Sequence, residues 1–166
     1  MKHRKSGNHF PGLFPMLVAY LLVTTLANLP QSVFAADFDP DDLAGKVVVL
    51  DFWASWCVPC RRSFPWLNTM HDRYADDGLV IVGVNLDLDR AEAERFLSEF
   101  PASFRIEYDE PKALAKRFEV IAMPSSYLIG RDGKILEQHL GFKERKQAEY
   151  EAAIVSALGQ TGSDDE

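Results

Sequence analysis

The fold is decided by one stretch of the sequence, Val47-Val-Val-Leu-Asp-Phe-Trp-Ala-Ser-Trp-Cys-Val-Pro-Cys-Arg-Arg-Ser-Phe-Pro-Trp66, which holds the only two cysteines among 166 residues. Its apolar, β-branched start at Val47 to Leu50 predicts a strand buried on both faces, and helix-compatible sequence follows with almost no loop between them. The predicted helix begins at Cys57 and ends near Tyr74, which places Cys57 at its N-terminus and Cys60 one turn inside.

The position of the two cysteines predicts different chemistry for each of them. Unpaired backbone N–H groups and the positive end of the helix dipole favour an ionised thiol at a helix N-terminus. We therefore expect Cys57 to be an exposed nucleophile with a lowered pKa, and Cys60 to be the buried resolving thiol.

Two other roles for the cysteines have to be weighed. A zinc site would need two further ligands from His71, His139 or carboxylates, and none of these stands at the spacing of a metal-binding motif. A purely structural disulfide is the other alternative, but a bridge that closes so short a loop removes little chain entropy and stabilises weakly.

A wider motif carries a family resemblance. The segment Asp51-Phe-Trp-Ala-Ser-Trp-Cys-Val-Pro-Cys60 resembles the active-site signature of the thioredoxin superfamily, and its Trp-Cys-Val-Pro-Cys form is similar to the TlpA/ResA-like branch of exported thiol-disulfide oxidoreductases. The resemblance implies an α/β thioredoxin fold, with a mixed central sheet flanked by helices and a TlpA-like helix-strand-helix insertion. It also implies an enzyme with a redox-active disulfide at Cys57 and Cys60, and neither a cofactor nor a metal.

The remaining sequence is compatible with that fold. Pro65, inside the predicted helix, stands at the same offset from the second cysteine as a proline of thioredoxin relatives. The apolar run at Leu79 to Asn85 predicts a second buried strand. Turn, cap and periodicity signals predict further elements: a helix at 90–100 capped by Asp89, a strand at 104–108, a helix at 109–117, a strand ending at 129, a turn at 130–133, a strand at 134–140 and a helix at 143–158.

Substrate binding is predicted around the cysteines and at Met123-Pro124. That dipeptide, followed by Ser-Ser-Tyr-Leu-Ile, resembles the cis-proline loop that faces the cysteines in the superfamily. A cis bond would leave the backbone of Met123 free to pair with an extended substrate strand. Taken without the resemblance, the residues favour an ordinary trans proline that opens an edge strand. Trp56 and Pro59 are expected to shape the surface around the thiols.

Asp51 is the third predicted catalytic residue. It lies inside a buried strand, where an unpaired carboxylate is costly and its pKa should rise. Thioredoxins have an acid at this position that accepts the proton of the second cysteine, whereas many TlpA-like relatives carry Asn. The resemblance therefore implies that Asp51 deprotonates Cys60 through a water. The alternative is a strand-end aspartate that hydrogen-bonds a turn.

The two ends of the chain differ from its centre. Residues 1–36 resemble a signal peptide, with Lys2, Arg4 and Lys5 before an apolar core, and with small residues suited to cleavage after Ala35 or Ala36. An uncleaved membrane anchor is the alternative. Residues 37–159 form one predicted domain, and residues 160–166 a disordered acidic tail. We expect a periplasmic or otherwise extracytoplasmic protein, soluble after cleavage or tethered by its N-terminal segment.

The charge balance bears on partners. Three of the 18 basic residues lie in the predicted leader, which leaves 15 against 25 acidic residues and a net charge of −10 from residue 37 onward. A nucleic-acid partner is therefore not expected. The expected partners of this monomer are protein disulfide substrates and a membrane thiol-disulfide electron donor that keeps it reduced for cytochrome c or cytochrome oxidase maturation. The alternatives are a net disulfide oxidant, and a copper chaperone that uses Cys57, Cys60 and His139 or Met123.

Overall fold

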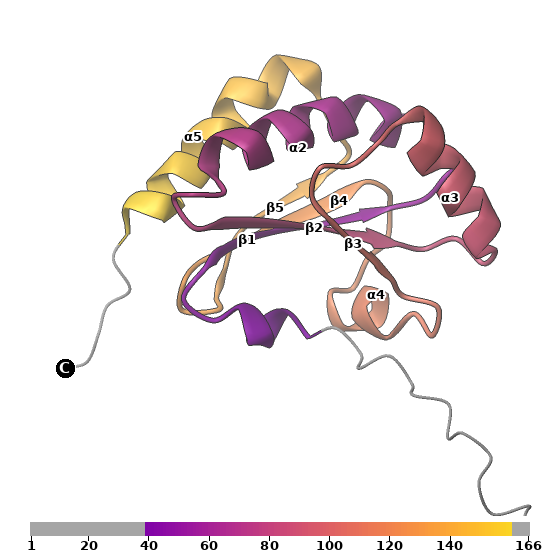
Figure 1. Cartoon of the computed structure of the whole chain (residues 1–166). Coiled ribbons are helices and arrows are strands. Elements are labelled where there is room, and N and C mark those ends of the chain that lie inside the picture. The colour runs from indigo at the N-terminus through magenta and orange to yellow at the C-terminus, as the bar shows by residue number, and fades with distance from the viewer. Residues whose placement is uncertain (1–38, 161–166) are drawn as a thin grey trace, which may run out of the picture. The chain divides into compact units, whose positions relative to one another are not determined.

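The central strand β1, Val47–Trp53, is buried over all seven of its residues and organises the sheet. The computed structural model describes residues 39–160. Within them, β1 lies between β2 and β4 in a five-stranded sheet of order β3-β2-β1-β4-β5 (Figure 1). β1, β2 and β3 are parallel, whereas β4 is antiparallel to β1 and to β5. This is the mixed sheet of a thioredoxin fold, as predicted.

The elements follow the predicted order with small shifts of their ends. In chain order they are η2 Pro40–Leu43, β1 Val47–Trp53, α2 Cys60–Tyr74, β2 Leu79–Asn85, α3 Arg90–Glu99, β3 Arg105–Tyr108, α4 Ala113–Arg117, β4 Ser125–Ile129, β5 Ile135–Leu140, η3 Glu144–Lys146 and α5 Gln147–Gly159.

Helices cover both faces of the sheet. Figure 1 shows α2, α3 and α5 on one face, and α4 with η2 on the other. Because side chains alternate along a strand, β1 supplies both cores. Val49 and Trp53 pack with the cysteines, α2, α3 and α5, whereas Leu50 and Phe52 pack toward residues of η2 and α4. Asp51 shares the alternation of Val49 and Trp53, and therefore lies on the cysteine side of the sheet.

Between β2 and β4 the chain inserts α3, β3 and α4, which is the predicted helix-strand-helix insertion. The side chain of Asp89 accepts a hydrogen bond from the Ala91 N–H and caps α3, as expected. α4 is shorter than predicted, because Lys112 adopts a left-handed conformation with φ 57° and helical geometry begins only at Ala113. The closing segment likewise starts as the 3-10 turn η3 before α5.

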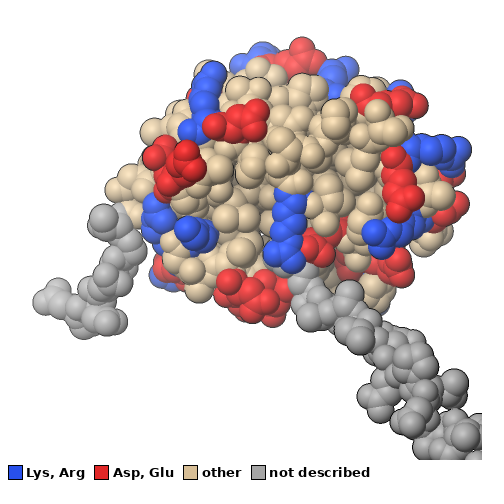
Figure 2. All heavy atoms as spheres, in the orientation of Figure 1, with Lys and Arg blue, Asp and Glu red and all other residues tan. Residues whose placement is uncertain are grey.

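The predicted leader and the predicted acidic tail are the two ends of the chain. The leader at 1–36 and most of the acidic tail at 160–166 lie outside the described residues. From 39 to 160, no helix is long and apolar enough to cross a bilayer. On the face shown in Figure 2, acidic and basic side chains are interspersed around an uncharged central area.

Candidate active site

The two cysteines form a disulfide where β1 passes into α2. Cys60 is the first residue of α2, and Cys57 lies in the preceding turn, where its N–H donates to the Ala54 carbonyl at 3.0 Å. The prediction that the helix begins at Cys57 is therefore wrong by three residues. Pro59 occupies the N-cap position, where its missing N–H costs nothing, and α2 starts immediately after it.

A backbone N–H at the start of α2 is directed at the sulfur of Cys57. The backbone N–H of Cys60 donates to Cys57 Sγ at 3.3 Å. In this disulfide form Cys57 is 3% exposed and Cys60 0%, so both are buried and Cys57 is not the exposed residue that was predicted. The reason is that both cysteines belong to the apolar cluster that includes Trp53 and Phe64.

The turn before the cysteines is held by a residue that the sequence analysis did not identify. Asp87, which is buried after β2, accepts hydrogen bonds from the N–H and the hydroxyl of Ser55, both at 2.9 Å. It also accepts one from the Asn85 side chain at 2.8 Å. The parallel register of Trp53 with Asn85 brings these two loops together. Asp87 thus fixes the backbone two residues before Cys57.

Removal of Asp87 should loosen this turn. Asp87→Ala leaves the donors of Ser55 and Asn85 without their acceptor, and we expect it to lower the free energy of unfolding by about 2–4 kcal/mol. Asp87→Asn keeps one oxygen for the N–H donors and turns an amide toward the Ser55 hydroxyl, so its loss should be less than half as large. Urea unfolding of both variants measures this, and equal losses would show that the hydrogen bonds do not carry the effect.

The loop at Met123 and Pro124 is placed beside the cysteines. The Met123–Pro124 peptide bond is cis, as the family resemblance implied. Met123 is half-buried and packs against the cluster that contains Cys57 and Cys60. Trp56 is 64% exposed next to Cys57, and Pro59 is half-buried. The register that pairs Phe52 with Ser125 puts this loop at the carboxyl end of β1, the end of the sheet at which Trp56, Pro59 and the disulfide follow.

Asp51 is buried in the middle of the sheet. Its Oδ1 accepts a hydrogen bond from the Ser126 hydroxyl on β4, the residue paired with it in the register. Its Oδ2 has no hydrogen-bond partner among the described residues. Burial raises the pKa of Asp51 to about 7, against a smaller lowering by the Ser126 hydrogen bond. Asp51 is thus neither at a strand end nor bonded to a turn, and its carboxyl titrates near neutral pH.

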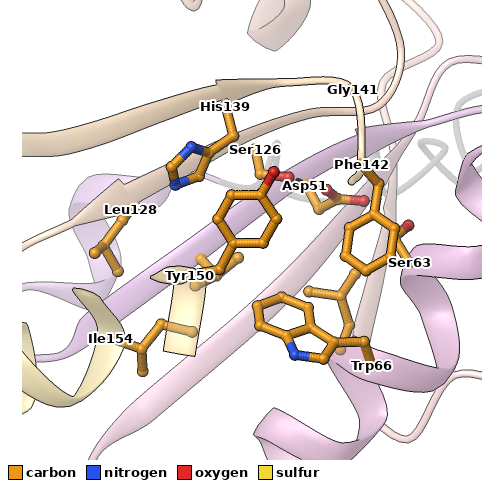
Figure 3. A pocket seen from close by; sticks show the side chains of 12 residues that line it. Asp51, Ser63, Trp66, Ser126, Leu128, His139, Gly141, Phe142, Tyr150 and Ile154 are labelled. Atoms are coloured by element: carbon orange, nitrogen blue, oxygen red, sulfur yellow. Dashed lines mark hydrogen bonds between the residues drawn. The ribbon is translucent and has the colours of Figure 1, made fainter. Parts of the chain in front are cut away.

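Asp51 opens onto a small cavity beneath α2 and α5. Figure 3 shows the side chains around it, among them Ser63, Ser126, His139 and Tyr150. The cavity leaves about 30 Å³ for the centres of water molecules, which is enough for one or two waters. The hydroxyl of Ser63 also donates to the carbonyl of Cys60 at 3.1 Å. The cavity therefore extends from Asp51 to Ser63 on α2, three residues after Cys60, and Cys60 itself is not among the residues that line it.

His139, which the sequence analysis considered only as a possible zinc or copper ligand, lines this same cavity. Its Nε2 lies 3.0 Å from Glu137 Oε2, and its ring packs against Tyr150 with centroids 4.4 Å apart. Across residues 39–160, no three side chains of His, Cys, Asp or Glu converge on a point that could hold a metal ion.

A disulfide between β1 and α2, a cis-proline loop beside it and an acid buried beneath it define a thioredoxin-superfamily protein with a Cys-x-x-Cys site. The Redoxin family model matches residues 25–154, and the chain belongs to that family.

Comparison with similar proteins shows which branch of the superfamily the chain resembles. Thiol-disulfide oxidoreductase ResA of Bacillus thuringiensis (strain Al Hakam) is 32% identical over 108 residues, which cover 65% of this chain and 62% of that relative's length. The crystal structure of a protein provisionally named thiol:disulfide interchange protein DsbE from Chlorobium tepidum has 45% identity and a TM-score of 0.70, with 72% of this chain and 84% of that chain covered. StoA from Bacillus subtilis has 28% identity and a TM-score of 0.58, with 66% and 84% covered. The chain is thus ResA-like, although it spans less than two thirds of the curated ResA relative.

Proposed function

We propose that this protein is a thiol-disulfide oxidoreductase that reduces disulfides in other proteins. The observation that carries the proposal is the Cys57–Cys60 disulfide at the start of α2, with the Cys60 N–H directed at the sulfur of Cys57. Similarity to ResA and to the Chlorobium tepidum protein, both named for thiol-disulfide chemistry, supports it.

The reaction begins from the dithiol form. The thiolate of Cys57 attacks a substrate disulfide, one substrate sulfur leaves as a thiolate, and a mixed disulfide forms between Cys57 and the other. Cys60 then gives its proton to Asp51 through a water in the cavity, and its thiolate attacks Cys57. The second substrate thiolate leaves, and the Cys57–Cys60 disulfide remains.

The substrate lies across the surface formed by Trp56, Pro59 and Met123, with Pro124 buried beneath it. The exposed indole of Trp56 provides apolar contact area beside the disulfide. The backbone of Met123, next to the cis bond, pairs with an extended substrate segment in the manner of strand addition. A backbone-directed contact of this kind accepts different substrate sequences.

We further propose an extracytoplasmic role as a monomer. The basic start and the apolar core of residues 1–36 support export, with cleavage after Ala35 or Ala36 or retention as an anchor. A membrane thiol-disulfide donor would then return the protein to the dithiol form, and the substrates would include apocytochrome c or copper-site proteins awaiting their metal. The mass of the protein isolated from an exporting host tests cleavage directly.

Reduction of insulin disulfides, with dithiothreitol as electron donor, tests the activity itself. Wild-type protein should accelerate the reduction in a catalytic amount, whereas Cys57→Ser should not exceed the uncatalysed rate because the attacking sulfur is gone. Wild-type protein that performs no better than Cys57→Ser would refute the proposed activity.

Alkylation tests the assignment of roles. In the reduced protein, iodoacetamide near neutral pH should modify Cys57 before Cys60, because Cys60 lies within α2 at 0% exposure while the Cys60 N–H stabilises a thiolate at Cys57. Peptide mass mapping after brief labelling measures the ratio. Faster labelling of Cys60 would reverse the two roles.

A further inference from the structure

Three polar side chains form a row across the sheet, from its centre to its edge. The register pairs Asp51 on β1 with Ser126 on β4, and Ser126 with His139 on β5. Side chains paired in this way lie about 4.5–5.5 Å apart at Cβ. All three line the cavity described above, and in Figure 3 the Ser126 side chain lies between those of His139 and Asp51.

His139 is the ionisable member of the row that is partly exposed, and Ser126 is partly exposed as well. The His139 side chain is 26% exposed, whereas Asp51 is 1% exposed. Ionisable groups face it from two elements: Glu137 on its own strand, and Glu149 with Tyr150 on α5. The pKa of Glu149 is lowered mainly by its hydrogen bond from Lys146, and His139 adds a smaller lowering, so the His139 and Glu149 side chains are close enough to interact electrostatically.

The proposed reaction requires such a connection. Asp51 accepts the proton of Cys60 only when it is ionised, so a proton that it already carries must leave first. Its carboxyl is buried, with one oxygen bonded to Ser126 and the other unpaired, so its proton exchanges with solvent through the groups or water that line the cavity. A hydroxyl, a water and an imidazole can each accept one proton while giving up another.

We propose that His139, acting through Ser126 and water in the cavity, transfers the proton between Asp51 and solvent. His139 is then a positioning residue for the resolving step, and this inference rests on the disulfide exchange proposed above. The step balances: the proton passes from Cys60 to Asp51, the Cys60–Cys57 bond forms as the Cys57–substrate bond breaks, and the electron pair leaves on the substrate thiolate. The proton then passes from Asp51 through Ser126 or water to His139 and to the buffer.

The reagent 5,5′-dithiobis(2-nitrobenzoate) separates the two chemical steps. Attack by Cys57 releases a first coloured thiolate, and resolution by Cys60 releases a second. In dilute buffer near pH 6, where most of the Asp51 carboxyl carries a proton before the reaction, His139→Gln should release the first thiolate at the wild-type rate and the second about 10-fold more slowly. Added imidazole should restore the second rate to within about 2-fold of wild type. Leu136→Ala, on the same strand but outside the cavity, is the control and should behave as wild type.

Coupling to Asp51 supplies a second readout. In the Asp51→Asn variant, adding His139→Gln should not slow the second thiolate release any further, because residue 51 no longer carries a carboxyl that exchanges a proton. A second release by His139→Gln at the wild-type rate, or a slowing that imidazole does not reverse, would overturn the inference. If wild-type protein released no second thiolate, the exchange function itself would fail and the inference with it, and that result does not depend on His139.

Discussion

The Cys60→Ser variant is expected to accumulate covalent mixed disulfides with its protein substrates and to lose at least about 100-fold of its turnover. Cys57 remains at the N-terminus of α2, with the N–H of residue 60 still directed at its sulfur, so it keeps its power to attack. The only sulfur placed to release the substrate is gone. Non-reducing electrophoresis and mass spectrometry of the variant, isolated from its own compartment, measure the adducts.

The Cys57→Ser variant is the matched control for this trap. Both variants lack the disulfide, so a difference between them reports the roles of the sulfurs rather than a general loss of stability. Cys57→Ser should yield no adducts, because Cys60 lies inside α2 and the helix-terminal N–H is directed at the sulfur of residue 57, not at its own. Adducts on both variants in equal amount would contradict the division into attacking and resolving cysteines. Their absence from both would speak against protein substrates.

The second large effect concerns Asp51 and pH. Burial raises the pKa of this carboxyl from 3.8 to about 7, so the folded state holds the proton more tightly than the unfolded state does. Stability from this group is therefore fully present below about pH 4 and is lost as pH rises to about 7. At 1.36 kcal/mol per pH unit, the loss in unfolding free energy is about 4 kcal/mol.

Asp51→Asn removes both the titration and the proton acceptor. The variant should be at least as stable as wild type at pH 7 to 8, should lack this decline with pH, and should resolve mixed disulfides about 10- to 100-fold more slowly. Unfolding curves at several pH values measure the stability, and single-turnover rates measure the resolving step. Asp76→Asn, at an exposed position, is the control and should change neither. A wild-type stability and rate in Asp51→Asn would mean that the carboxyl is solvated and inactive.

The sequence was sufficient for the parts of the fold that depend on burial. The runs at 47–53 and 79–85 are apolar enough that strand length and position follow from hydrophobicity alone, and both strands have the predicted bounds. The same reasoning placed Asp51 in a buried strand and anticipated its raised pKa. The turn and cap signals also predicted α3, β4 and β5, because such signals depend only on residues that are neighbours in the sequence.

What could not be predicted depends on contacts between distant segments. Asp87 anchors Ser55 only because β1 and β2 end side by side, 32 residues apart in sequence. His139 joins Asp51 only through the pairing of β5 with β4, and no local pattern reveals that register. The start of α2 was misplaced because the Cys57 N–H closes a turn with Ala54 instead of entering the helix. Local propensity does not distinguish these outcomes.

The reduction potential of the Cys57–Cys60 couple tests the central claim most directly, since it decides both whether the disulfide is redox-active and in which direction it works. The full chain is equilibrated with defined dithiothreitol buffers, and the dithiol fraction is counted by alkylation and mass spectrometry. We expect one reversible two-electron transition with a midpoint more negative than about −180 mV, the value of protein disulfide isomerase. A less negative midpoint would contradict a reductant and indicate a net oxidant, and the lack of any reversible transition would contradict thiol-disulfide exchange altogether.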